Sequence, residues 1–190
     1  MSKNIFEDQV FEKFDFLNTN GTNEFNNCTF KNGDFTGVKF DHQDFVDCTF
    51  SQCNLSVVKV DGTRFNNTRF LNCKIWGVDF SRCSKFLFSV AFEGASLNHS
   101  TFYKNELKKT IFKDCLLKEV SFIECNLNEA VFVNCDLQNA IFDRSNLEKA
   151  DFTSARNYSF NPEINKIKKA KFSIPEVVGL LSHYDISITD

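Results

Sequence analysis

An apolar residue recurs at every fifth position along most of this chain. From Phe25 to Phe80 each such position holds Phe, Leu, Ile or Val, and after a slip of two residues the same period runs from Phe92 to Phe152. An amphipathic helix repeats its apolar face every 3.6 residues and a strand every second residue, so a period of five fits neither. The chain is therefore predicted to form a repeat architecture, in which each unit buries its apolar residue against its neighbours.

A second column of small residues accompanies the first. Two positions before most of the large apolar residues stands Cys, Ala, Val, Ser, Thr or Gly, while the other three positions of each unit are mostly polar. Each unit thus points one large and one small side chain inward. Four units close a square turn, which places residues 20 apart above one another at about the 4.8 Å spacing of neighbouring strands. After Phe92 the large residues alternate between Phe and Leu, which predicts Phe columns on two opposite faces.

The segment CNLNEAVFVNCDLQNAIFDRSNLEKADF (residues 125–152) follows this pattern unit after unit. In this respect the chain resembles the pentapeptide repeat proteins over residues 25–155. The resemblance implies an all-β fold, a right-handed quadrilateral β-helix, for which the length allows about six or seven coils. We expect residues 1–24 to form an N-terminal cap or irregular first coil, because Phe6, Phe11, Phe14 and Phe16 do not follow the period.

The C-terminal residues 156–190 are predicted to form a turn, a short α-helix and a tail. Ser173 and Glu176 have the spacing of a capping box, and Pro175 suits the first helical turn. A helix of about ten residues is marginal alone and must pack against something. It either caps the open end of the solenoid or joins two copies in a homodimer. The candidate dimer-interface residues are Val177, Val178, Leu180, Leu181, Tyr184 and Ile186.

The period slips within residues 81–91. An unbroken period would place Lys85 in the core, so the chain must bulge here, close to the additional aromatic residues Phe86 and Phe88. Two interpretations remain open. Either the bulge repacks locally, or Lys85, Phe86 and Phe88 form a projecting contact for a partner, since loops on rigid scaffolds often carry function.

Eight cysteines are present, and seven occupy the small inward column. Stacked pairs such as Cys28 and Cys48 are close enough for a disulfide, but their parallel Cβ directions and a reducing cytosol favour buried free thiols. There is no CxxC pair, and His42, His99 and His183 are scattered, so neither a metal site nor a catalytic group is expected. We therefore expect a protein with no cofactor and no enzymatic activity.

The charge balance is nearly even. The 22 basic and 25 acidic residues give a net charge of −3, and the acidic excess lies before residue 81. This balance does not favour direct nucleic-acid binding. The N-terminus is charged and no apolar run is long enough to span a membrane, so we expect a cytoplasmic protein without membrane contact.

The terminal helix and the size of the chain resemble the Qnr, MfpA and McbG group of pentapeptide repeat proteins. That resemblance implies a tail-to-tail homodimer that binds DNA gyrase or topoisomerase IV as a DNA mimic and counters quinolones or a microcin. The small net charge and the lack of long loops depart from this pattern. A local negative face is expected from Asp34, Asp41, Asp44, Asp47 and Asp61. The alternative is a general protein-interaction solenoid with an unrelated partner, because a fold does not define a function.

Overall fold

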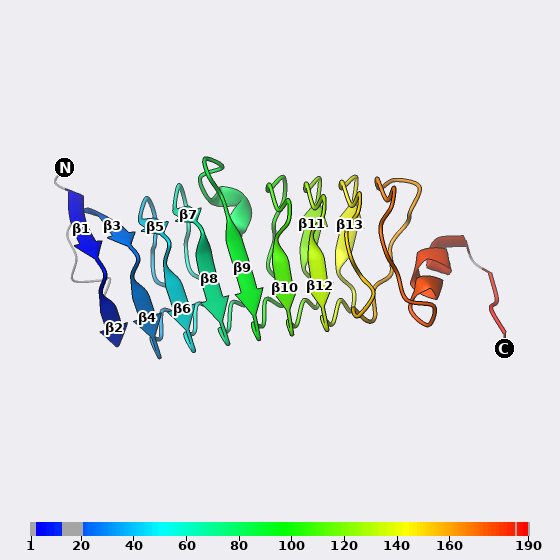
Figure 1. The fold of residues 1–190 in the computed structure, drawn as a ribbon, viewed down its shortest axis with the longest axis horizontal. Coiled ribbons are helices and arrows are strands. Elements are labelled where there is room, and N and C mark those ends of the chain that lie inside the picture. The colour runs from blue at the N-terminus through cyan, green and yellow to red at the C-terminus, as the bar shows by residue number, and fades with distance from the viewer. Residues whose placement is uncertain (1–2, 13–20, 185, 190) are drawn as a thin grey trace.

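The computed structural model describes residues 3–12, 21–184 and 186–189, which form a rod of about seven β-helical turns (Figure 1). The N-terminus lies at one end of the rod and the C-terminus at the other. Its elements are β1 (Lys3–Glu7), β2 (Val10–Glu12), β3 (Thr22–Asn26), β4 (Thr29–Lys31), β5 (Asp44–Val46), β6 (Thr49–Ser51), β7 (Arg64–Asn66), β8 (Thr68–Leu71), η2 (Phe80–Arg82), β9 (Val90–Glu93), β10 (Ile111–Lys113), β11 (Ser121–Ile123), β12 (Val131–Val133), β13 (Ile141–Asp143) and η3 (Val177–Tyr184).

All strand pairs are parallel, and they build the walls of the rod. The sheets have the orders β1-β3-β5-β7, β12-β10-β9-β8-β6-β4-β2 and β11-β13. Phe50 pairs with Phe70, and Phe112 with Phe132, so the predicted register of 20 residues is confirmed. Across the slip Phe70 pairs with Phe92 instead. The two additional residues are therefore absorbed between β8 and β9, and the register resumes after them.

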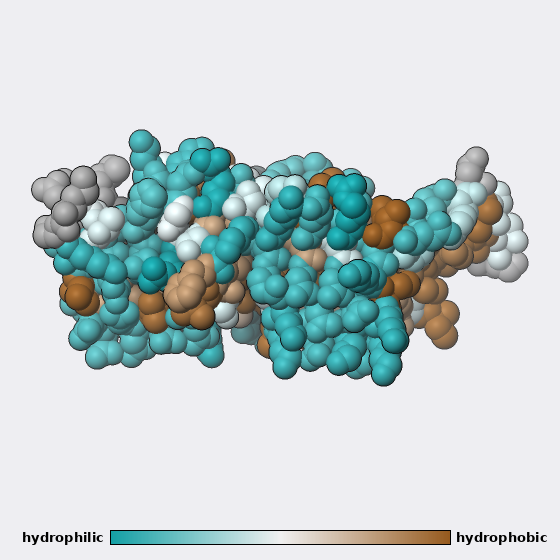
Figure 2. All heavy atoms as spheres, turned by 90° about the horizontal axis from the view of Figure 1, so that it is seen from above, coloured by the Kyte–Doolittle hydropathy of each residue, from teal (hydrophilic) through white to brown (hydrophobic). Residues whose placement is uncertain are grey.

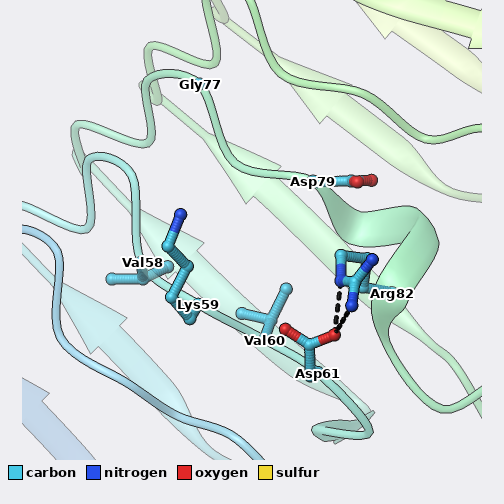
Figure 3. Close-up of a pocket in the computed structure, with 7 residues that line it drawn as sticks. All are labelled: Val58, Lys59, Val60, Asp61, Gly77, Asp79 and Arg82. Atoms are coloured by element: carbon cyan, nitrogen blue, oxygen red, sulfur yellow. Dashed lines mark hydrogen bonds and ion pairs between the residues drawn. The ribbon is translucent and has the colours of Figure 1, made fainter.

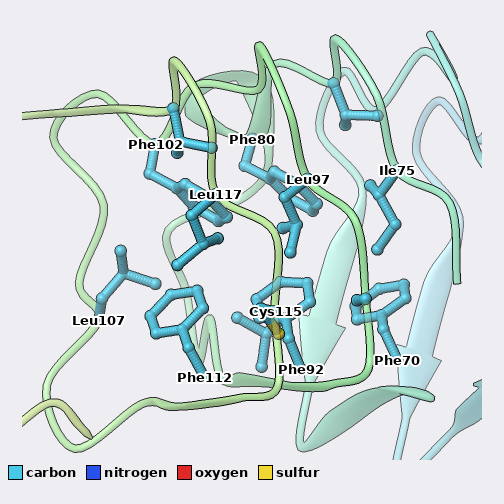
Figure 4. Packing of buried hydrophobic residues seen from close by; sticks show 14 of the residues in the cluster. Phe70, Ile75, Phe80, Phe92, Leu97, Phe102, Leu107, Phe112, Cys115 and Leu117 are labelled. Carbon is cyan, nitrogen blue, oxygen red and sulfur yellow. The ribbon is translucent and has the colours of Figure 1, made fainter. Parts of the chain in front are cut away.

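The predicted column of large apolar residues forms the core, and every member from Phe25 to Phe152 is buried. The rings of Phe92 and Phe112 stack at 5.4 Å and those of Phe112 and Phe132 at 5.0 Å. Phe102, from the opposite face, meets Phe112 edge-on at 6.2 Å (Figure 4). Offset stacks and edge-to-face pairs are the arrangements that aromatic rings prefer. The predicted division of Phe between two opposite faces is confirmed.

The first coil is more regular than predicted. Phe6 of β1 pairs with Phe25, and Phe11 of β2 pairs with Phe30, each at a separation of 19 residues instead of 20. The rings of Phe6 and Phe25 stack at 5.0 Å. The stack therefore continues into these residues at a separation one residue shorter than the period of the later coils, because a single missing residue shifts the count without breaking the stack. Phe14 and Phe16 lie outside the described residues.

The β-helix also extends past the predicted boundary at residue 155. Bridges join Asn146 to Lys166 and Asp151 to Lys171, and the ring of Phe172 stacks on Phe152 at 5.5 Å. The period alone would place polar Asn157 and Pro162 in the core of this last coil. Tyr158 and Phe160 fill the space instead, and both are buried. The five-residue period is not visible in the sequence of this coil, because Tyr158 and Phe160 stand at positions outside it.

A short helix is present at the C-terminus, but η3 is a 3₁₀-helix and not the predicted α-helix. The expected capping box is not formed, since the carboxylate of Glu176 accepts a hydrogen bond from the backbone N–H of Asn157 at 2.7 Å. The N–H of Gly179 bonds to the carbonyl of Glu176, three residues earlier. Docking against the end of the rod thus favours the tighter helix, which is common in short segments.

All eight cysteines are buried free thiols. The Sγ of Cys48 donates to the carbonyl of Phe25 at 3.2 Å, and that of Cys125 donates to the carbonyl of Phe102 at 2.8 Å. Burial raises the pKa of both thiols to about 12. The thiolate is the reactive form, so these side chains behave as small apolar residues.

We expect the thiols of the folded protein to resist modification. Ellman's reagent added to native protein at pH 8 should give almost no rapid release of thionitrobenzoate, because all eight thiols are buried and the reagent cannot reach them. The same sample in guanidinium chloride should release eight equivalents, one for each free cysteine. Rapid reaction of several thiols before denaturation would show that the inward column is open to solvent.

Candidate functional site

The predicted insertion forms η2 and the loop before β9, which stands out from the rod (Figure 1). The side chain of Asp79 begins η2 by accepting a hydrogen bond from the N–H of Ser81 at 3.0 Å. Beyond η2, Phe86 is 64% exposed, whereas Phe88 is 6% exposed and packs against Phe80 with ring centroids 6.5 Å apart. Phe88 thus repacks the core, as the first interpretation predicts, while Phe86 projects from the rod; a contact between the loop and a partner stays a prediction.

Of the three predicted contact residues, Phe88 is therefore a core residue. It fills the space that the interrupted period leaves empty. Lys85 and Phe86 remain on the surface, where the Lys85 amine donates to the carbonyl of Tyr103 at 3.5 Å. The guanidinium of Arg64 lies 5.7 Å from the centre of the Phe86 ring, within the range of a cation–π contact. The exposed tip of the loop is formed by Phe86 and Leu87.

We expect substitution of the two phenylalanines of the loop to have very different effects on the stability of the protein. Phe88→Ser should lower the free energy of unfolding by about 3 kcal/mol or more, because it removes a buried ring. Phe86→Ser should change it by about 0.5 kcal/mol or less, as is usual for an exposed site. Urea unfolding followed by circular dichroism measures both variants. Equal losses of stability would contradict the assignment of Phe88 to the core and Phe86 to the surface.

The predicted acidic residues do not form a continuous negative face. Asp44 is buried and ion-paired to Lys3 at 2.8 Å and to Arg64 at 3.4 Å. Asp61 pairs with Arg82, whose hydrogen bond lowers the pKa of the Asp61 carboxyl. Asp34 bonds instead to Thr36 in its own turn. The expectation of a local negative face was wrong for Asp44 and Asp61, because basic side chains lie close to both.

Asp41 and Asp47, the other two acidic candidates, lie on different corners of the same coil. The carboxylate of Asp41 accepts a hydrogen bond from the N–H of Asp61 at 3.2 Å. Asp47 accepts from the amide of Asn67 at 2.6 Å. Both carboxylates are thus held by groups on the next coil.

Farther along the rod, charges of opposite sign alternate between stacked coils. Glu124 lies between Lys104 at 3.3 Å and Arg144 at 3.6 Å. Glu129 lies between Lys109 at 3.7 Å and Lys149 at 3.2 Å. Such surface pairs contribute little stability each. Their alternation neutralises the wall of the rod, so this half does not reproduce the uniform negative charge of a DNA backbone.

The C-terminal helix η3 divides the predicted dimer residues into two groups. Leu180 is buried against the end of the rod, so it docks the helix on its own chain. The hydroxyl of Tyr184 donates to Glu163 at 2.7 Å, which adds a second anchor. The exposed candidates are Val177, Val178, Leu181, Tyr184 and Ile186. Apolar side chains are also visible at this end of the molecule, whereas most of the remaining surface seen from above is hydrophilic (Figure 2).

Within the part of the chain that the structure describes, no helix is both long and apolar enough to cross a bilayer. The same residues contain no group of three or more His, Cys, Asp or Glu side chains placed to hold a metal ion.

Comparison with solved structures gives similar rods. A trypsin-treated form of QnrB1, described as a plasmid-mediated fluoroquinolone resistance protein, is 17% identical with a TM-score of 0.57, and the match covers 99% of this chain and 100% of that chain. A second trypsin-treated form is 15% identical with a TM-score of 0.52, and the match covers 100% of both chains. No curated protein matches this sequence.

The sequence model of the pentapeptide repeat region matches residues 23–86 and 85–160. These two segments meet at the insertion loop and together span most of the β-helix. The repeated unit, the square coil and the stacked Phe columns agree with this match. On this evidence, the chain belongs to the pentapeptide repeat family.

Proposed function

We propose that this chain is a non-enzymatic binding protein whose target is a type II DNA topoisomerase, either DNA gyrase or topoisomerase IV. The observation that carries the proposal is the similarity to QnrB1, which extends over 99% of this chain and 100% of that chain. QnrB1 is described as a fluoroquinolone resistance protein. A rod of the same construction along its whole length is suited to the same kind of target, with protection from a quinolone or a microcin as the outcome.

The charges argue for a particular mode of contact. Because Lys104, Glu124 and Arg144 alternate along the wall, the rod carries little long-range negative potential in this half. Binding would then rest on the shape of the rod and on local contacts. Phe86 and Leu87 at the tip of the loop are exposed apolar residues beside Arg64, and aromatic and Arg side chains are enriched at the centres of protein interfaces.

We further propose that η3 pairs two copies of the chain in a cytoplasmic homodimer. Val178 is 45% exposed and Leu181 is 38% exposed, on a helix that Leu180 holds in place. Apolar residues on a docked helix are well placed to cover the same residues of a second copy. Light scattering after size exclusion should give twice the chain mass for the wild type and a single chain mass for Leu181→Asp. A wild-type monomer at about 100 µM would overturn the dimer, because a stable homodimer binds more tightly than this.

A second function remains, namely an interaction solenoid with an unrelated protein partner. The alternation of charge favours this second function. Charges that are paired within the rod do not present the uniform negative surface that a DNA-binding site of a partner would recognise. The two proposals differ in the identity of the partner and agree that the chain acts by binding.

A direct binding measurement distinguishes the topoisomerase proposal from the proposal of an unrelated partner. DNA gyrase and topoisomerase IV would be immobilised and exposed to the purified chain, with Phe86→Ser as the loop variant. We expect saturable binding to at least one enzyme, weakened about tenfold or more by Phe86→Ser, because a buried aromatic contact at an interface commonly contributes more than 1 kcal/mol. The absence of binding by folded wild-type protein would reject the topoisomerase proposal and leave the unrelated partner.

A further inference from the structure

The insertion loop takes the place of a strand beside Arg64. The sheet β1-β3-β5-β7 ends at β7, and the loop is fastened to the coil of β7 at two points. The N–H of Ser84 donates to the carbonyl of Thr63 at 2.9 Å, and the N–H of Ser89 donates to the carbonyl of Phe65 at 2.9 Å. The four loop residues between these two anchors thus stand opposite the single residue Arg64. Additional residues opposite one position must bulge out of the wall.

The two ends of this bulge are held independently of its tip. Arg82, the last residue of η2, pairs with Asp61 of the preceding coil, and Figure 3 shows the guanidinium turned toward that carboxylate. At the other end, Phe88 is buried in the core against Phe80. The path of the chain into and out of the bulge is therefore fixed by residues other than Arg64.

The tip of the loop has little main-chain support of its own. Within the described residues, the N–H groups of Lys85, Leu87 and Phe88 have no main-chain partner. The N–H of Phe86 donates to the hydroxyl of Ser84 at 3.3 Å. Leu87 has a φ of 55, which is uncommon for an apolar residue, and such a backbone persists only where surrounding contacts determine it. Side-chain contacts must therefore decide where the tip lies.

Arg64 provides such a contact. Its guanidinium lies 5.7 Å from the centre of the Phe86 ring. In the part of the chain that the structure describes, the Nε of Arg64 is buried without a hydrogen-bond partner. A cation is attracted to the negative face of an aromatic ring, and the attraction grows where water is excluded. The ring of Phe86 is thus held from below by Arg64, while the rest of the ring faces solvent.

Arg64 is itself held by charges on the same wall. In the register of the sheet, Asp44 of β5 stands opposite Arg64, and Glu24 of β3 stands opposite Asp44. Asp44 is ion-paired to Arg64 at 3.4 Å and to Lys3 at 2.8 Å, and Lys3 also pairs with Glu24 at 2.5 Å. Two carboxylates and two cations thus form a cluster without net charge. The Asp44 carboxylate, which is buried, keeps the Arg64 side chain on the wall beneath the tip.

We infer that Arg64 is a positioning residue, which Asp44 holds in place and which fixes Phe86 in its outward orientation at the tip of the loop. The inference rests on the proposed function in one respect, namely that the tip contacts a topoisomerase. Arg64 acts through the ring and does not itself touch the partner. A tip that is fixed before binding loses less conformational entropy in the complex, and this raises the affinity.

The order of the tip in the free protein tests this role without any partner. Backbone ¹⁵N relaxation gives an order parameter for each amide, and we expect about 0.8 or more at Phe86 and Leu87 in the wild type. Arg64→Gln should lower both values below about 0.6, because the ring loses its contact. Asp44→Asn should do the same, because Arg64 loses its ion pair. Lys31→Gln removes an exposed cation from the other large sheet and should leave both values unchanged.

Three results of this measurement would overturn the inference. The first is an equally ordered tip in Arg64→Gln and the wild type, and the second is a wild-type tip that is already below about 0.6. The third is a fall of the order parameters along the whole rod, which would give Arg64 a general structural role. Circular dichroism verifies that each variant is folded. Arg64→Gln and Asp44→Asn break different links of the same chain of contacts, so each tests the inference where the other does not fold.

Binding to immobilised DNA gyrase and topoisomerase IV tests whether Arg64 acts through the ring. We expect Arg64→Gln to weaken binding about threefold or more in the wild type, and by less than about twofold when Phe86 is already replaced by serine. Equal losses in the two backgrounds would mean that Arg64 touches the partner directly, and would overturn the positioning role. If the wild type binds neither enzyme, the proposed function is rejected, and the order parameters of the tip alone decide the role of Arg64.

Discussion

Replacing Phe112 by alanine is expected to lower the free energy of unfolding by about 3–5 kcal/mol. The ring is fully buried, stacks between Phe92 and Phe132 at 5.4 and 5.0 Å, and meets Phe122 edge-on. The variant loses the transfer energy of the ring, leaves a cavity and removes several aromatic contacts in one step. Stacked coils cannot close the cavity without shifting the backbone, because each strand is bonded to the coils before and after it.

Urea unfolding followed by far-ultraviolet circular dichroism measures this loss. Tyr103→Ala is a suitable control, because Tyr103 is an aromatic residue that is 39% exposed on the same half of the rod. We expect the control to lose about 1 kcal/mol or less. If Phe112→Ala and Tyr103→Ala lost the same stability, the Phe columns would not be the principal support of the rod.

Gly179→Ala is expected to detach η3 from the rod. A Cβ atom at this position would lie 1.9 Å from the carbonyl oxygen of Tyr158, a main-chain atom that cannot move aside without distorting the last coil. Relief of the clash requires η3 to move away, which exposes Leu180 and breaks the hydrogen bond between Tyr184 and Glu163. We expect the variant to lose about 2 kcal/mol or more and to lose the proposed dimer.

Proteolysis and light scattering test this prediction. Limited chymotrypsin digestion should cut the variant within η3, after Leu180, Leu181 or Tyr184, at least about tenfold faster than the wild type, because detached segments are cleaved first. Gly37→Ala is the matched control, because a Cβ atom at Gly37 would meet nothing within 4 Å. The only cost of this substitution is the backbone strain of alanine at a φ of 69. Unchanged digestion and mass in Gly179→Ala would mean that η3 is not held against Tyr158.

The period of five was sufficient to predict the core, because one buried side chain in each unit is the dominant requirement of a narrow solenoid. Where the coil departs from that requirement the prediction failed. Phe6 and Phe11 belong to a coil that is one residue shorter, and Tyr158 and Phe160 fill a coil from shifted positions. In each case packing retained the stack while the sequence lost the period, so the sequence predicted neither the register of the first coil nor the presence of the last one.

The candidate site was less predictable. The slip in the period located the loop. Phe86 and Phe88 are the same residue type within the slipped segment, so the sequence does not show which of the two rings reaches the interior. The charge of Asp44 was misjudged because Lys3 and Arg64 approach it from other coils. Among the described residues the N–H of Val60 has no main-chain partner, because η2 interrupts the ladder on the next coil, and no residue type in the sequence marks this interruption.

Supercoiling by purified DNA gyrase, titrated with this protein in the presence and absence of ciprofloxacin, tests the proposed function most directly. The account predicts that the protein either restores supercoiling in the presence of the drug or inhibits the enzyme without it, with an effect at or below about 10 µM. Phe86→Ser should weaken that effect, while Lys31→Gln should not. No effect on gyrase or on topoisomerase IV at this concentration, with folded protein verified in the same sample, would contradict the proposal.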